Sequence, residues 1–133
     1  MLYTMMQACK ETNMTYQALK FYCNEGLIPN VKRDKNNRRI FDEHDIAWIG
    51  SLTCLKKCGM SIQEMKEYLA LCLQGQSTIP QRKHILALKQ EALRQQIREL
   101  EGSIAYIDWK QNFYDEILSG ARPYESNVAC TEK

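Results

Sequence analysis

An apolar seven-residue repeat in the second half of the sequence is the feature that most constrains the fold. Between Pro80 and about Leu118 only Gly102 disfavours a helix, so one helix of about 55–60 Å is predicted. Gln90 and Gln111 are polar interruptions of the repeat. One set of heptad positions holds Leu86, Leu93, Leu100, Ile107 and Tyr114, and the complementary set holds Ile97, Ile104 and Leu118. This pattern is typical of a coiled-coil seam.

Such a helix cannot bury its seam against the rest of a chain of 133 residues. An intramolecular helical hairpin is the alternative, but the sequence offers no second long helix to form one. A homodimer, with its helices antiparallel or parallel, is therefore favoured. The predicted dimer interface consists of Leu86, Leu93, Ile97, Leu100, Ile104, Ile107 and Tyr114.

The composition is that of a folded, soluble protein, with 44% hydrophobic and 26% charged residues. The length corresponds to about one domain, or to a small head with an extension. No apolar run approaches the roughly 18 residues that span a bilayer, and no basic segment followed by an apolar core marks a secretory signal. We therefore expect a cytoplasmic protein with no membrane partner.

Positive charge is concentrated near the front of the chain, although the net charge is only +2. From Lys20 to Arg39, six basic residues meet Glu25 and Asp34, which leaves a local charge of +4. From Ser61 to the end, nine basic residues meet ten acidic ones. A polyanionic partner at the front of the chain explains this asymmetry, and a solvated charged face is the alternative.

Two short helices are predicted at the start of the chain. Thr4 and Gln7 form the ends of a capping box, which opens the first helix. Asn13 can adopt the left-handed conformation of a tight turn, and Thr15 can cap the second helix, which ends at Gly26. Two short helices joined by such a turn are typical of a helix-turn-helix, whose second helix can enter the major groove of DNA.

A basic hairpin and a second helix pair follow. Residues 31–41 suit two short strands around the tip Asp34–Asn37, because asparagine tolerates the positive φ of hairpin turns. Asp42 can cap a helix over residues 43–58, and Ser61 opens a second capping box and a helix to about Leu73. These signals predict a mainly α protein: a winged helix-turn-helix head with a second helix pair (residues 1–74), a linker and long dimerisation helix (75–118) and a tail (119–133).

The head offers two kinds of candidate DNA contact. Basic side chains can bind phosphates, which sets affinity and its salt dependence. Glutamine can pair with adenine, and aromatic rings can contact the methyl group of thymine; for Phe21, packing against the wing is an equal alternative. The phosphate candidates are Lys20, Arg33, Lys35, Arg38 and Arg39, and the base-edge candidates are Tyr16, Gln17 and Phe21.

The sequence contains six cysteines, none of them in a CxxC pair. No paired histidines follow at zinc-finger spacing, so neither a metal site nor a cofactor is predicted. In a reducing cytosol most of these thiols should be free and packed as small hydrophobic groups. The cysteines are Cys9, Cys23, Cys54, Cys58, Cys72 and Cys130.

The order and spacing of these features resemble the MerR family of bacterial transcription regulators over essentially the whole chain. The matching landmarks are Tyr3-Thr4, Leu19-Lys20-Phe21-Tyr22, Gly26-Leu27-Ile28-Pro29, Arg39-x-Phe41, Asp42-x-x-Asp45-Ile46 and Cys58-Gly59-Met60-Ser61-Ile62. Residues 54–62, Thr78-Ile79-Pro80-Gln81-Arg82 and Tyr106-Ile107-Asp108-Trp109-Lys110 are similar to the aldehyde- and electrophile-responsive (AdhR/NmlR-like) branch.

The resemblance implies an antiparallel coiled-coil homodimer that binds a pseudo-palindrome in an overlong promoter spacer. Activation would follow from twisting the DNA so that RNA polymerase engages both promoter elements. The chain departs from the family pattern at the second helix, where Gln17 and Lys20 stand in place of arginines. It also departs at the wing, where Asn37-Arg38 replaces Gly-Tyr, and at the first turn, where Asn13 replaces glycine.

By its matching position, Cys54 is implied to be the sensor of a reactive aldehyde, another electrophile or an oxidant. Lys57, one turn further on, would lower the pKa of this thiol, whereas an apolar run in mid-helix would raise it. The alternative is a regulator with buried, structural cysteines and a different effector or none. An enzyme is disfavoured because no Cys/His pair is evident. A pure coiled-coil scaffold would not need the basic wing.

Overall fold

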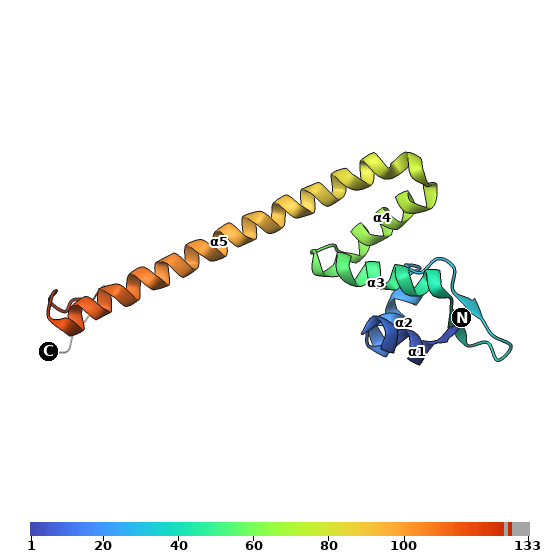
Figure 1. Cartoon of the computed structure of the whole chain (residues 1–133), viewed down its shortest axis with the longest axis horizontal. Coiled ribbons are helices and arrows are strands. Elements are labelled where there is room, and N and C mark those ends of the chain that lie inside the picture. Colours follow the sequence, from blue (N-terminus) through green and yellow to red (C-terminus); the bar gives the residue numbers. More distant parts are fainter. Residues whose placement is uncertain (127, 129–133) are drawn as a thin grey trace. The chain divides into compact units, whose positions relative to one another are not determined.

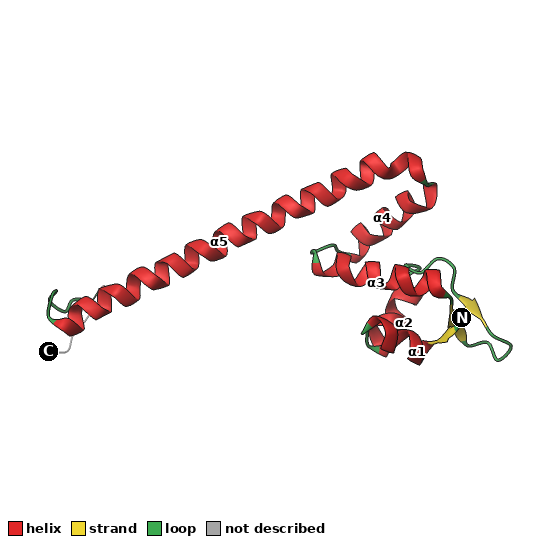
Figure 2. Cartoon of the chain, in the orientation of Figure 1, coloured by secondary structure: helices red, strands yellow, loops and turns green. Residues whose placement is uncertain are grey.

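The computed structural model describes residues 1–126 and 128, so that residue 127 and residues 129–133, with Cys130, lie outside the described part. The described chain is mainly helical with a small sheet (Figures 1 and 2). Two units form, residues 1–91 and residues from Ala92 onward. In chain order the elements are β1 (Tyr3–Thr4), α1 (Met5–Thr12), α2 (Tyr16–Asn24), β2 (Lys32–Arg33), β3 (Arg39–Phe41), α3 (Glu43–Lys57), α4 (Ile62–Gln74), the 3-10 turn η1 (Gln76–Thr78) and α5 (Ile79–Ser119).

Side-chain caps fix the two helices of the helix-turn-helix. The Thr4 hydroxyl accepts the backbone N–H of Gln7 at 3.2 Å, and the Gln7 side chain accepts that of Thr4 at 2.9 Å, as predicted. Asn13 ends α1 in the left-handed region, with φ of 54°. Thr15 then accepts the N–H of Ala18 at 3.1 Å. These local interactions set where α1 begins and ends and where α2 begins.

The sheet is antiparallel, with the strand order β1-β3-β2. The β2–β3 hairpin pairs Arg33 with Arg39 and was predicted. Strand β1 pairs Tyr3 with Phe41 and was not predicted, because two residues directly before a helix cap show no alternating pattern. The added strand ties the start of α1 to the wing.

The core of the first unit is built from α1 to α4, from β3 and from the segments that follow α2 and α3. The Trp48 indole N–H donates to the carbonyl oxygen of Leu27 at 2.7 Å, so α3 also holds the segment after α2 by a hydrogen bond. The largest fully buried side chains are Phe41, Leu19, Leu27, Ile49, Leu52 and Met65. By contrast, no residue of α5 is fully buried within the chain.

Two further capping boxes start the second helix pair. Asp42 was predicted as the cap of α3, and its carboxylate accepts the N–H of Asp45 at 2.8 Å. The Asp45 carboxylate returns the contact by accepting the N–H of Asp42 at 2.9 Å, which sequence reasoning had not predicted. The hydrogen bond that the Asp45 N–H donates to the Asp42 carboxylate lowers the pKa of Asp42. Burial raises the pKa of Asp45.

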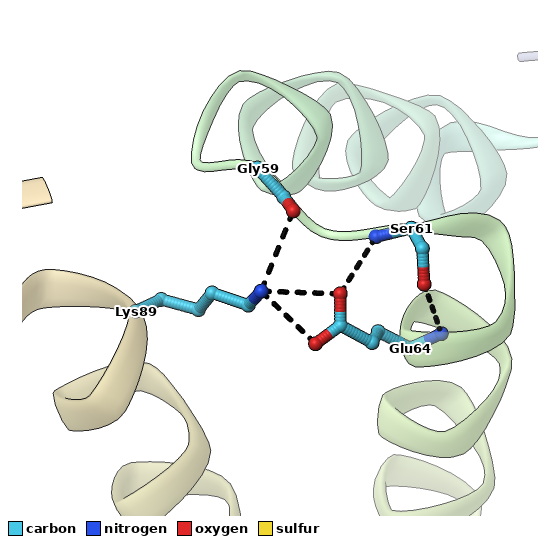
Figure 3. A network of polar contacts seen from close by, with 4 residues as sticks. All are labelled: Gly59, Ser61, Glu64 and Lys89. Atoms are coloured by element: carbon cyan, nitrogen blue, oxygen red, sulfur yellow. Dashed lines mark hydrogen bonds and ion pairs between the residues drawn. The ribbon is translucent and has the colours of Figure 1, made fainter. Parts of the chain in front are cut away.

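The corner between α3 and α4 also holds the beginning of α5 (Figure 3). Ser61 and Glu64 form the predicted capping box, with distances of 3.1 and 2.9 Å. The Lys89 ammonium lies 2.9 Å from the nearer Glu64 oxygen and donates to the carbonyl oxygen of Gly59 at 3.4 Å. The pKa of Glu64 is held below its ordinary value, mainly by the hydrogen bond from the Ser61 N–H and secondly by the hydrogen bond from Lys89.

Replacing the Ser61 cap should destabilise the protein. Ser61→Ala removes the acceptor of the Glu64 N–H, and the loss of such a cap costs about 0.5–2 kcal/mol of unfolding free energy. Urea unfolding at one fixed protein concentration measures the effect. Ser103→Ala, an exposed position inside α5, is the control and should change stability by less than about 0.5 kcal/mol. Equal effects of the two substitutions would contradict the capping role.

The contribution of the Glu64 carboxylate should depend on pH. Because the folded pKa is lowered, the contribution is complete above the ordinary glutamate pKa of about 4.3 and is lost as pH falls through the folded pKa. We therefore expect Glu64→Gln to be less stable than the parent protein at neutral pH, with the difference shrinking in acid. Urea midpoints from about pH 7 to about pH 3 test this, and a difference independent of pH would refute it.

Candidate nucleic-acid interface

Helix α2 separates its side chains into a buried and an exposed face. Leu19 and Tyr22 are buried in the core of the first unit. The exposed face carries the predicted contact residues Tyr16, Gln17, Lys20 and Phe21. The ring of Phe21 is 45% exposed, and its centroid lies 6.1 Å from that of Tyr22 in the same helix. The first two turns of α2 therefore present polar, basic and aromatic groups outward.

The tip of the wing is held by a single carboxylate. One oxygen of Asp34 accepts the backbone N–H of Asn36 at 2.9 Å and that of Arg38 at 3.0 Å. Asn37 adopts the left-handed conformation expected of the turn, with φ of 62°. The acidic side chain at the tip thus shapes the turn, and the arginines next to it give the wing its charge.

Some basic side chains of the wing are fixed by hydrogen bonds among the described residues, and others are not. The Arg39 guanidinium donates to the side-chain oxygen of Asn24 at 2.7 Å, and this bond joins the wing to the end of α2. Arg33 donates to the carbonyl oxygen of Asn37 at 3.0 Å. Lys35 and Arg38 are exposed, and their side chains have no partner within the described part of the chain. Arg39 is therefore positioned by the fold, and Lys35 and Arg38 are available to a ligand.

The start of α1, the start of α2 and the wing enclose a cleft of about 410 Å³, which we call the wing cleft. It brings together four predicted contact residues, Tyr16, Arg33, Arg38 and Arg39, and the other four lie outside its lining. Sequence reasoning missed the contribution of α1. The only available signal was the Thr4 cap, which fixes which residues open that helix. The α1 and wing residues that complete the lining are Thr4, Met5, Met6 and Asp34.

Cys54 is exposed in the single chain. The buried residues of α3 include Ile49, Leu52 and Leu55, and Cys54 lies outside this stripe. It borders an open hollow of about 560 Å³, here called the Cys54 hollow. The lining residues are Gly50, Ser51, Cys54, Leu55, Tyr68 and Leu86.

The other described thiols are less accessible than Cys54. Cys9 is buried, and burial raises its pKa. Cys23 is half-buried, and its pKa is raised by burial even though Arg39 and Arg33 act in the opposite direction. Cys58 and Cys72 are also half-buried. Since the thiolate is the reactive form and must be reached by the reagent, exposure distinguishes Cys54 within this group.

The apolar seam of α5 is open to solvent. Leu100 is 64% exposed and Ile104 is 60% exposed. Apart from the half-buried Leu93, every residue of the predicted dimer interface is exposed. Within the described residues, no helix is both long enough and apolar enough to cross a membrane, and no cluster of three or more metal-ligating side chains forms.

Comparison with known proteins identifies the family. Residues 3–72 match the MerR HTH family of regulatory proteins, and residues 47–109 match the family described as MerR, DNA binding. An uncharacterized HTH-type transcriptional regulator of Haemophilus influenzae is 33% identical over 87% of this chain and 86% of its own length. AdhR, an HTH-type transcriptional regulator of Bacillus subtilis, is 39% identical over 65% of this chain and 62% of its own.

Solved structures show the same fold. HiNmlR, described as a MerR family regulator lacking the sensor domain and bound to promoter DNA, superimposes with a TM-score of 0.74 and 31% identity. The match covers 91% of this chain and 92% of that one. A MerR family regulator of Bacillus thuringiensis gives a TM-score of 0.71 and 30% identity over 86% of this chain and all of its own. The chain therefore belongs to the MerR family of DNA-binding transcriptional regulators.

Proposed function

We propose that the protein acts as a homodimer that binds a pseudo-palindromic promoter site through α2 and the wing. Modification of the Cys54 thiol by an aldehyde, another electrophile or an oxidant then changes transcription. The observation that carries the proposal is the wing cleft, where the exposed start of α2 meets the arginines of the β2–β3 hairpin. HiNmlR, one of the similar proteins of known structure, is described as bound to promoter DNA.

The basic residues and the outer face of α2 suit different parts of the duplex. Lys20, Arg33, Lys35 and Arg38 supply exposed positive charge for the phosphates. The start of α2 adds the partial positive charge of a helix N-terminus. Tyr16, Gln17 and Phe21, on the outer face of the same helix, are the side chains for base edges in the major groove.

Dimerisation follows from the exposed seam of α5. Its apolar residues lack a cover within the chain, and a second copy of the helix supplies an identical seam. A two-fold pair of heads reads two inverted half-sites, which accounts for a pseudo-palindromic target. In the proposed mechanism the dimer twists an overlong promoter spacer and thereby lets RNA polymerase engage both promoter elements.

The exposed thiol of Cys54 is the proposed trigger. A thiolate adds to the carbonyl carbon of an aldehyde, and the carbonyl oxygen takes up a proton, giving a reversible hemithioacetal. An oxidant would instead convert the thiolate to a sulfenic acid or a disulfide. Either adduct would lie in the Cys54 hollow beside Tyr68 and Leu86. Leu86 also belongs to the predicted dimer seam, so the adduct would adjoin the dimer helix.

Removing one wing charge should weaken binding in a salt-dependent way. In Arg38→Ala each of the two subunits loses a phosphate contact, so the slope of log K against log salt should become shallower by about two units, at specific and unrelated sites alike. Filter binding or fluorescence anisotropy over a salt series measures the slope. Lys83→Ala removes the same charge from exposed α5 and should leave the slope unchanged. Identical slopes for Arg38→Ala and the parent protein would count against the wing.

Modifying Cys54 should change how the promoter is distorted. We expect reduced protein to protect a two-fold site upstream of its own operon, with central reactivity that changes when Cys54 is alkylated. Footprinting with reduced and alkylated protein tests this, and Cys54→Ser provides a control that should no longer respond to the reagent. An unchanged footprint would remove Cys54 as the trigger while keeping the regulator. No protection at low salt would contradict the proposed DNA target.

A further inference from the structure

Two basic side chains hold the first turns of α5 against α4 and the segments at its ends. The Arg82 guanidinium donates to the Thr78 hydroxyl at 3.0 Å and to the carbonyl oxygen of Gly75 at 2.8 Å. Seven residues later, the Lys89 ammonium lies 2.9 and 3.1 Å from the two carboxylate oxygens of Glu64. Lys89 is two residues from the end of the first unit, so it acts close to the point where α5 leaves that unit.

These contacts lie at opposite ends of α4. Gly75 caps the C-terminal end of α4, whereas Glu64 stands in its first turn. Lys89 also reaches the carbonyl oxygen of Gly59 at the end of α3, where the partial negative charge of a helix C-terminus favours a cation (Figure 3). One contact alone would leave α5 able to pivot about it. Because Arg82 and Lys89 lie about 10 Å apart along the helix, together they fix its direction.

The apolar contact between them does not have this effect. Ile85 packs against the core of the first unit and so keeps α5 close to it. Apolar contacts are non-directional, whereas hydrogen bonds depend on distance and angle. The Lys89 side chain is 25% exposed and that of Glu64 is 41% exposed, so the pair is partly shielded from solvent. Without the ammonium, α5 should therefore stay attached to the first unit but lose its fixed direction.

We propose that Lys89 is a positioning residue for DNA recognition, which sets the distance between half-sites that the protein accepts. This inference rests on the homodimer of the proposed function, in which α5 joins the two heads. A dimer binds two half-sites tightly only when its heads lie at the matching distance. With about 10 Å between the two contacts, a shift of about 1 Å at Lys89 turns the head by about 6° relative to α5.

Binding to a series of half-site spacings tests this role in the full chain. The series keeps both halves of the protected promoter site and adds or removes one base pair between them. The parent protein should bind the natural spacing most tightly. Lys89→Met removes the ammonium and keeps an apolar stem. The ratio of Kd at an altered spacing to Kd at the natural one should then fall about threefold or more, because a less rigid dimer adapts to either spacing. Fluorescence anisotropy at one salt concentration measures this ratio.

Matched variants separate direction from charge. Lys83→Met removes the same charge from an exposed position of α5 and should leave the ratio unchanged. Lys89→Arg keeps a cation with several N–H donors and should retain the ratio of the parent protein. Glu64→Gln keeps an acceptor for the Ser61 N–H but loses the charge, so the ratio should fall. Adding Lys89→Met to Glu64→Gln should lower it no further, because both act through one contact.

Equal weakening of binding at every spacing in Lys89→Met would overturn the inference, since it would show a role in charge or stability alone. An unchanged ratio would overturn it too, as would a parent protein without a preferred spacing. If circular dichroism shows that Lys89→Met is unfolded, an unchanged ratio in Glu64→Gln decides against the inference.

Sedimentation equilibrium of the parent protein separates failure of this inference from failure of the proposed homodimer. A dimer whose Lys89→Met variant keeps the parent ratio overturns the role of Lys89 and leaves the homodimer intact. A monomer at every concentration used for DNA binding overturns both.

Discussion

The apolar seam of α5 is the constraint on which the rest of this molecule depends. The first unit closes its own core with residues that precede α5, and α5 contributes no fully buried side chain to it. Uncovered apolar surface is unfavourable by about 25 cal/mol per Å², so a continuous exposed stripe calls for a partner. In the homodimer that we propose, a second copy satisfies that need and, through its two-fold symmetry, also fixes the number and relative orientation of the DNA-binding heads.

The features that could be predicted from the sequence are those determined over a few residues. The caps at Thr4, Thr15 and Ser61 and the left-handed turn at Asn13 were confirmed, because each depends on one side chain and its nearest backbone. Strand β1 escaped prediction because its pairing with β3 joins residues far apart in the sequence. The exposure of Cys54 was left open for a similar reason. An apolar helix can be covered on several faces, and only the packed structure shows which one stays open.

In the candidate site, too, local features could be predicted from the sequence, and features that depend on tertiary packing could not. Which side chains of α2 face outward followed from helical periodicity, and the basic hairpin followed from its turn residues. That four of these residues share one cleft with Met6 is a property of the assembled sheet and helices. The departures from the family pattern also become intelligible. Of the two positions in α2 where the family pattern has arginine, Lys20 keeps the positive charge and Gln17 does not, while Arg38 adds a positive charge to the wing.

The bond between Arg39 and Asn24 bears on the energetics of recognition. It joins the hairpin to the end of α2, so the two elements that we propose contact the duplex are linked in the protein alone. A surface ordered in advance gives up little conformational entropy when it binds. When a rigid protein surface binds a more deformable DNA duplex, the protein sets the shape of the complex and the DNA deforms. In the proposed complex, the protein is therefore the template, and the elastic energy is stored in the double helix.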